Sequence, residues 1–117
     1  MNRTEMRIPP IHPGEVLFEE IMQPRGIGIN ALAKYMGIRS NRISEIVNGK
    51  RSITVDTAMR LALVFPFTTP GFWLGLQTDY DIEVTELARG DTLRKEVKQF
   101  PNPIHRQDLQ QTGREIK

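Results

Sequence analysis

The chain has 117 residues, a mass of 13.4 kDa and a hydrophobic fraction of 38%, which is enough material for one modest core. It contains no cysteine, which excludes disulfide bonds, thiolate metal sites and cysteine nucleophiles. The net charge is only +2. No apolar run approaches the roughly 20 residues that cross a bilayer, and there is no cysteine, so we expect a cytoplasmic protein with no membrane partner.

Charge is distributed unevenly along the chain. Between Lys34 and Arg51 there are five cations and one acid, whereas residues 79–86 carry four acids and no cation. Because the two regions are electrostatically opposite, the sequence predicts separate surfaces with separate partners.

Turn and capping residues divide the chain into five predicted helices. They run from Pro13 to a stop at Pro24 and Gly26, from about 29 to Met36, from a cap at Ser40 to about Val47, from a cap at Thr54 to about Phe65, and from Pro70 to about Ala88. Residues 1–11 are expected to form an N-terminal arm, and 12–88 one helical domain. Residues 89–117 are predicted to form a C-terminal extension whose last part is flexible.

Small and aliphatic residues between positions 32 and 46 have the spacing of a helix-turn-helix. Ala33 is small where the two helices would cross, and Gly37 tolerates the left-handed conformation of the turn. Ile38, Ile43 and Ile46 are spaced to wedge the second helix against the first. The sequence therefore predicts an all-α fold, a five-helix bundle built around a helix-turn-helix.

The second helix of this unit is predicted to present a short polar face. If its aliphatic residues face inward, the 100° step per residue turns the polar ones outward. An α-helix fits the major groove, where Asn can pair with adenine, Arg with guanine, and Glu can accept from cytosine. We therefore predict base contacts from Arg39, Ser40, Asn41, Arg42, Ser44 and Glu45.

Cations and amides beside this helix are predicted to bind the phosphate backbone. The predicted phosphate contacts are Asn30, Lys34, Asn48, Lys50 and Arg51. Two alternatives stay open. A polar helix face with flanking cations is also common on soluble proteins, and Glu45 can tether Arg42 through an i, i+3 ion pair instead of touching a base.

Three motifs occur together and in order, namely "HPGE", "NRISEIVNGKRSIT" and "FWLGLQTDYD". Over about His12 to Val84 the sequence resembles the HigA-type antitoxins of the XRE group, and the VapA/VapI virulence-associated proteins are similar. The resemblance implies a lambda-repressor-like (Cro/C1-type) bundle. It also implies a homodimer that binds a palindromic operator, represses its own operon and neutralises a HigB-type toxin, an mRNA endonuclease of the RelE class. Gly28-Ile29 stands where the family commonly has Ser-Gln, so Asn30 is expected to replace the usual helix cap.

The last two predicted helices carry more apolar side chains than one small core can bury. Pairing two copies of the chain would cover the surplus and set two recognition helices about 34 Å apart on DNA. The predicted dimer contacts are Leu63, Phe72, Trp73, Leu76 and Tyr80. The alternative is that Trp73 and Tyr80 complete the core of the monomer.

Nothing in the sequence predicts an enzyme, a metal site or a cofactor. The acids at 79–86 do not form an EF-hand, because Val84 stands where that loop needs Gly, and Gly90 where it needs Glu. They are expected to be solvated surface or a contact for a basic toxin. His12 and His105 are isolated and are expected to lie outside the core. Other functions left open are a stand-alone phage or plasmid repressor, a protein-interaction module and a nuclease.

Overall fold

The computed structural model describes residues 8–101, and within this range the chain is helical with no strand. A first helix passes without a break through α2 (Pro13–Val16), the π-helical η1 (Leu17–Met22) and the short 3₁₀ turn η2 (Gln23–Arg25). It is followed by α3 (Ile29–Met36), α4 (Ser40–Val47), α5 (Val55–Val64) and α6 (Pro70–Glu96). The all-α prediction of five helices is confirmed. Predictions about the first residues of the arm, the end of the tail and His105 lie outside the described residues.

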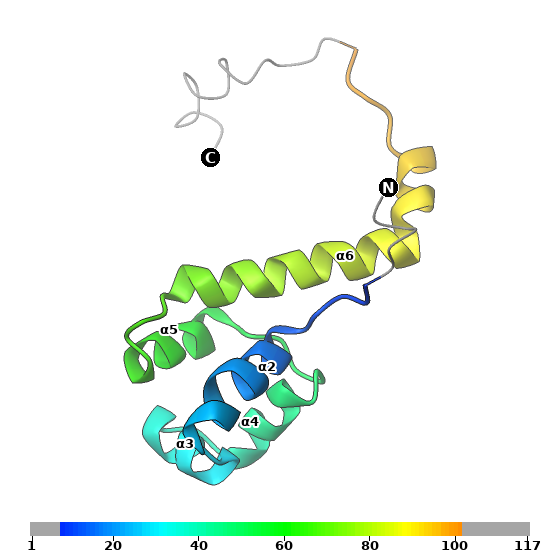
Figure 1. The fold of residues 1–117 in the computed structure, drawn as a ribbon. Coiled ribbons are helices and arrows are strands. Elements are labelled where there is room, and N and C mark those ends of the chain that lie inside the picture. Colours follow the sequence, from blue (N-terminus) through cyan, green and yellow to red (C-terminus); the bar gives the residue numbers. More distant parts are fainter. Residues whose placement is uncertain (1–7, 102–117) are drawn as a thin grey trace, which may run out of the picture.

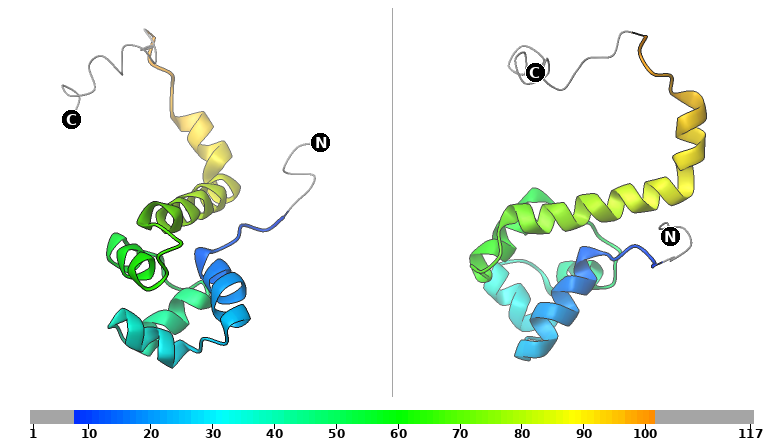
Figure 2. Two further views of the ribbon diagram at one scale, coloured as in Figure 1. Left: turned by 60° about the vertical axis from the view of Figure 1, so that its left-hand side comes forward. Right: turned by 45° about the horizontal axis from the view of Figure 1, so that its top comes forward.

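The helix-turn-helix forms one end of the molecule, and α6 spans the other side (Figure 1). Helix α6 packs on α5 and on α2, while α3 packs on α4. Two further views show that the C-terminal part of α6 extends beyond the rest of the bundle (Figure 2). No helix in the described range is long and apolar enough to cross a membrane.

The core lies where the first helix, α3, α4 and α5 meet, with Trp73 of α6 packed into it. Fully buried side chains include Leu17, Leu32, Ile43, Ile46 and Leu61. Ile43 and Ile46 are at positions where the spacing of the sequence predicts an inward-facing residue, and burial of each contributes about 1.5 to 3 kcal/mol. The inward stripe of α4 thereby fixes which of its residues face solvent.

Trp73 belongs to this core, which corrects its predicted place in a dimer interface. The side chain is 0% exposed, and its indole Nε1 donates a hydrogen bond to Thr68 Oγ1 at 3.0 Å. A side chain enclosed by its own protomer has no surface left for a partner. The alternative interpretation, that Trp73 completes the core of the monomer, is the correct one.

Helix α6 is longer than the sequence predicts, since it ends at Glu96 and not near Ala88. Gly90 does not end the helix, because its backbone does not adopt the positive φ that a glycine at a helix end usually has. The helix bends in this part (Figures 1 and 2), and Arg94 Nη2 lies 2.6 Å from a carboxylate oxygen of Glu86. A Cβ on Gly90 would overlap these two side chains, so glycine leaves room for the pair. Hydrogen bonds from Arg94 hold the pKa of Glu86 below its usual range.

Candidate nucleic-acid interface

Helices α3 and α4 meet through a tight turn that begins at Gly37. This residue has φ +70°, as predicted, and its N–H donates to Lys34 O at 3.3 Å. The next N–H, of Ile38, donates to Ala33 O at 3.0 Å, so two carbonyls at the end of α3 are satisfied. Helix α4 then begins at Ser40, with Arg39 as its N-cap and no side-chain cap bond. The predicted cap at Ser40 is therefore one residue too late.

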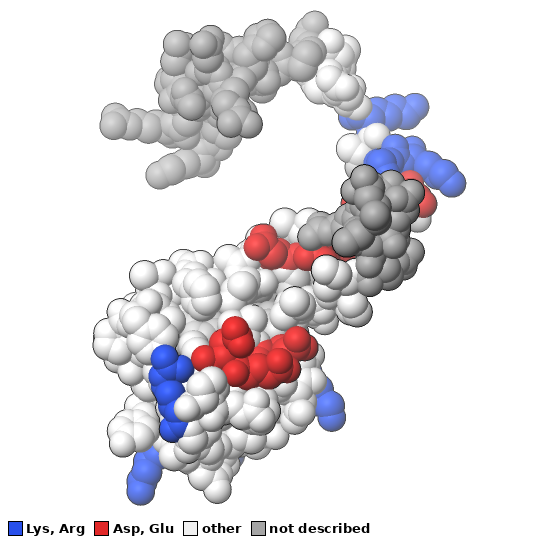
Figure 3. Space-filling model, in the orientation of Figure 1, with Lys and Arg blue, Asp and Glu red and all other residues white. Residues whose placement is uncertain are grey.

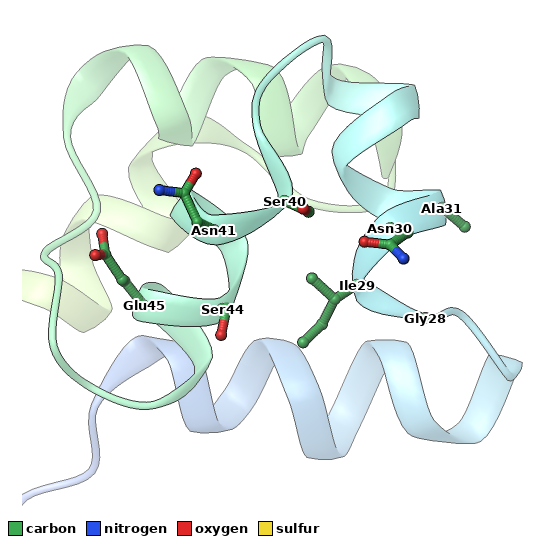
Figure 4. Close-up of a pocket in the computed structure, with 8 residues that line it drawn as sticks. All are labelled: Gly28, Ile29, Asn30, Ala31, Ser40, Asn41, Ser44 and Glu45. Carbon is green, nitrogen blue, oxygen red and sulfur yellow. The ribbon is translucent and has the colours of Figure 1, made fainter.

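The outward face of α4 borders a shallow hollow beside the start of α3. It is lined by Gly28, the N-cap of α3, by residues 29–31 of α3, and by Ser40, Asn41, Ser44 and Glu45 of α4 (Figure 4). The structure thus brings together four of the six residues predicted to contact bases, and Arg39 is exposed next to them. Their contact with DNA stays a prediction.

Arg42 does not join this face. Its Nη2 donates to Thr57 Oγ1 and to Asp56 Oδ2, the latter at 3.1 Å, so the side chain is turned toward α5. Arg42 flanks the inward stripe of α4 and there reaches the carboxylate of Asp56, so its predicted base contact is not supported by this arrangement and stays a prediction.

Asp56 joins three helices through its two arginine partners. It accepts from Arg42 of α4 and, at 2.8 Å, from Nε of Arg60, whose Nη1 donates to Met36 O of α3 at 2.8 Å. Hydrogen bonds from Arg60, and then from Arg42, lower the pKa of Asp56 against the opposing effect of burial. This network helps to hold the two helices of the helix-turn-helix against α5.

Glu45 is tethered, but not by the residue expected. Its Oε1 accepts from Arg51 Nε at 2.8 Å and lies 2.7 Å from Arg51 Nη2. The predicted ion pair with Arg42 is wrong, because Arg42 is bound to α5. Both members of the Glu45–Arg51 pair are about half exposed, so the pair is weak.

Among the other residues predicted to contact phosphates, one side chain is hydrogen-bonded within the protein and the others are exposed. Asn48 Nδ2 donates to Ser44 O at 2.9 Å, so this amide is used inside α4. Asn30 is exposed at the second position of α3 and does not cap it, because Gly28 is the N-cap and no side chain accepts there. Lys34 and Lys50 are exposed. Phosphate binding by the five predicted residues stays a prediction.

His12 is a buried structural residue, so the prediction that it lies outside the core is wrong. It is 9% exposed, and its Nδ1 accepts a hydrogen bond from Gly14 N at 2.9 Å, which caps the first helix. Its ring contacts that of Tyr80 edge-on, with centroids 4.9 Å apart. The position of His12 directly before Pro13-Gly14 indicates this capping role, since it is the N-cap position of a helix that begins with proline.

Burial lowers the pKa of His12, with smaller raising contributions from Asp81 and the backbone of Arg51. A pKa below 6.5 in the folded state means that the unfolded chain binds more protons as the pH falls. The free energy of unfolding is therefore expected to decrease below about pH 6.5, by about 1 kcal/mol when the cap bond is lost. Urea unfolding at pH 7 and pH 5 measures this. His12→Asn, which keeps an acceptor but does not titrate, should show a smaller decrease, and equal decreases would contradict the assignment.

Apolar side chains remain exposed on α5 and α6. Leu63 is 81% exposed and Phe72 44%, whereas Leu76 and Tyr80 are half-buried. Farther along α6, Ile82 and Leu87 are 62% and 56% exposed, and Val97, the C-cap of this helix, is 69% exposed. Trp73 is no longer among the predicted dimer contacts, and the other four stay a prediction.

Acidic side chains gather on one face of the molecule (Figure 3). The space-filling view shows carboxylates grouped over the first helix, with others along α6 (Figure 3). Glu15, Glu19 and Asp79 are exposed on these elements. In the part of the chain that the structure describes, no three His, Cys, Asp or Glu residues are arranged to hold a metal ion.

Comparison with known proteins agrees with this architecture. The helix-turn-helix family profile matches residues 18–73. Virulence-associated protein I of Dichelobacter nodosus is 46% identical over 79 residues, which are 68% of this chain and 72% of that protein. An addiction module antidote protein of the HigA family from Coxiella burnetii has a structure with a TM-score of 0.75 and 48% identity, covering 80% of this chain and 100% of that one.

The chain belongs to the HigA family of helix-turn-helix proteins. A second HigA structure, that of Pseudomonas aeruginosa antitoxin HigA with the higBA promoter, has a TM-score of 0.73 and 34% identity over 76% of this chain and 96% of that one. The resemblance deduced from the three motifs is confirmed, and so is the helix-turn-helix fold. As a HigA-family helix-turn-helix protein, the chain falls among DNA-binding regulators.

Proposed function

We propose that the chain is the antitoxin of a toxin–antitoxin module, that it binds its own operator as a dimer, and that it neutralises a HigB-type mRNA endonuclease. The observation that carries the DNA-binding part is the outward polar face of α4 beside the N-terminus of α3. The P. aeruginosa HigA solved with its promoter, 34% identical, supports the same use of the fold. A HigA antitoxin is a regulator and not an enzyme.

Helix α4 enters the major groove with its N-terminal residues first. There Arg39 can bond a guanine, Asn41 an adenine, and Ser40 either kind of base edge. The inward stripe of α4 and the network around Asp56 fix the helix while these side chains reach outward. Affinity comes from phosphate contacts by exposed cations, of which Lys50 follows the helix directly.

Dimerisation uses the exposed apolar side chains of α5 and α6. In a single copy Leu63 is largely exposed and one side of Phe72 faces solvent. A two-fold pair would cover them and would place two copies of α4 about 34 Å apart, one turn of the duplex. The operator is then near-palindromic.

Salt dependence tests the DNA contact. Affinity for the DNA upstream of the reading frame is expected to fall steeply with salt, and Lys50→Ala should weaken all sequences alike. It should also reduce the slope of log K against log salt by about one for each protomer bound. Fluorescence anisotropy between 50 and 200 mM salt measures this, with Lys95→Ala at the far end of α6 as the matched control. A flat salt response, or equal slopes for the two variants, would contradict the contact.

Toxin neutralisation is tested separately from DNA binding. The neighbouring small reading frame should stop growth when expressed alone, and co-expression with this chain should restore growth and yield a co-purifying complex. Charge reversal of Glu15 and Glu19 tests whether the carboxylates over the first helix contribute. If operator binding persists but no neighbouring product is toxic or binds, the protein is a stand-alone repressor.

A further inference from the structure

Ile29 is an apolar residue at the centre of the polar surface proposed to face DNA. It is the first residue of α3, its side chain is half-buried, and its inner part packs against the core. Its outer part lines the hollow together with Asn41 and Ser44 of α4. Figure 4 shows the Ile29 side chain pointing across this hollow toward Ser44, with Asn30 beside it.

The surroundings make Ile29 a rigid and accessible contact. Isoleucine is branched at Cβ, so few rotamers are open to it, and packing against the core restricts it further. Its neighbour Gly28 has no side chain, and a Cβ built there would meet nothing within 4 Å. The hollow is therefore open on that side, and a group from outside can reach the exposed methyl groups of Ile29.

Isoleucine can form no hydrogen bond, so a contact from Ile29 must be apolar. The base edges of the major groove expose one apolar group, the C5-methyl of thymine. The residues around Ile29 offer hydroxyl and amide groups for the polar edges of adjacent bases. A thymine methyl placed in the hollow would meet Ile29 while Asn41 and Ser44 bond its neighbours.

We propose that Ile29 is a specificity-determining residue that reads the C5-methyl of one thymine in each operator half-site. The inference rests on the proposed DNA-binding function and deepens it. Removing a methyl group from such a contact is expected to weaken binding about fourfold in each half-site. Two half-sites would together give about sixteenfold.

The test uses thymine-to-deoxyuridine substitution, which deletes this methyl and leaves the pairing edge unchanged. Each thymine of the footprinted operator is replaced in turn, and the dissociation constant is measured by fluorescence anisotropy at fixed salt. Wild-type protein should lose about fourfold at one position in each half-site. Ile29→Ala should bind the thymine and deoxyuridine duplexes equally, and Ile29→Val, which keeps two methyl groups, should retain most of the difference. Far-UV circular dichroism and thermal unfolding check that each variant is folded at the assay temperature.

A second test places the same methyl group on a base with a different hydrogen-bonding edge. With cytosine at the same position, 5-methylcytosine should bind wild-type protein more tightly than cytosine, and Ile29→Ala should not distinguish them. If no deoxyuridine duplex weakens wild-type binding, or if Ile29→Ala and Ile29→Val both keep the full difference, the inference is wrong while operator binding stands. If wild-type protein binds no upstream DNA, the proposed function fails and the inference fails with it.

Discussion

Replacing Gly14 by alanine is expected to lower the free energy of unfolding by about 3 kcal/mol, at the upper end of the usual cost of overpacking. Gly14 lies where the first helix crosses the C-terminal end of α4, and a Cβ there would overlap the carbonyl oxygen of Ile46 and lie 2.9 Å from Cα of Val47. These are backbone atoms, which cannot move aside as a flexible side chain can. The helices must separate, so α4 should also lose its position and operator binding should weaken.

Gly75→Ala is the matched control for this substitution. Gly75 is in α6, and a Cβ built on it meets nothing within 4 Å. The same change should there be neutral or stabilise the helix by up to about 1 kcal/mol, because alanine loses less backbone entropy. Urea unfolding of both variants measures the two effects. A Gly14→Ala variant within about 0.5 kcal/mol of wild type would show that the close contact is not needed.

Trp73→Ala is expected to cost about 3 to 5 kcal/mol, because it empties a fully enclosed site. Since such a variant could fail to fold, Trp73→Phe provides a milder test. It keeps a ring in the core but loses the hydrogen bond to Thr68, for which about 1 to 2 kcal/mol is expected. Chemical unfolding monitored by circular dichroism applies to both, because this signal does not need the tryptophan.

Leu63→Asp provides the contrast to the Trp73 variants. Leu63 is 81% exposed, so its replacement should leave the far-UV spectrum of the protomer unchanged. Sedimentation should instead show a shift from dimer to monomer, with weaker operator binding. A Leu63→Asp protein that stays dimeric would remove Leu63 from the interface, and a Trp73→Ala protein as stable as wild type would contradict the burial.

Local signals were enough to predict the helix-turn-helix. Gly37 ends α3 because the turn needs a positive φ, and the aliphatic spacing of Ile43 and Ile46 fixes the inward side of α4. The outward position of Ser40, Asn41 and Ser44 then follows from helix geometry alone. These features depend on residues close together in the chain, which is why the sequence is sufficient.

The partners of the charged side chains could not be predicted in this way. Arg42 bonds Asp56, which is 14 residues away, and Arg51 bonds Glu45 across the turn after α4. Which carboxylate an arginine meets depends on how separate helices pack, and the i, i+3 spacing of Arg42 and Glu45 gives no information about that. The same holds for Trp73, whose aromatic character favours an interface as much as a core.

Helix ends governed by side-chain contacts were also missed. Glycine often ends a helix, yet α6 continues past Gly90. The Arg94–Glu86 pair occupies the space that a Cβ at this position would take. His12 caps the first helix through a ring nitrogen, which is less common than a cap by Ser, Thr, Asp or Asn. In both places the tertiary arrangement outweighs the ordinary preference of the residue.

Hydroxyl-radical footprinting on the DNA upstream of the reading frame tests the central claim most directly. Wild-type protein is expected to protect two patches on one face of the duplex, about one helical turn apart and centred on a near-palindrome. Arg39→Ala combined with Asn41→Ala should abolish this protection with the fold intact, whereas Arg89→Ala combined with Lys95→Ala, on α6, should leave it unchanged. The absence of any protected site, or protection that survives the Arg39 and Asn41 substitutions, would contradict the account.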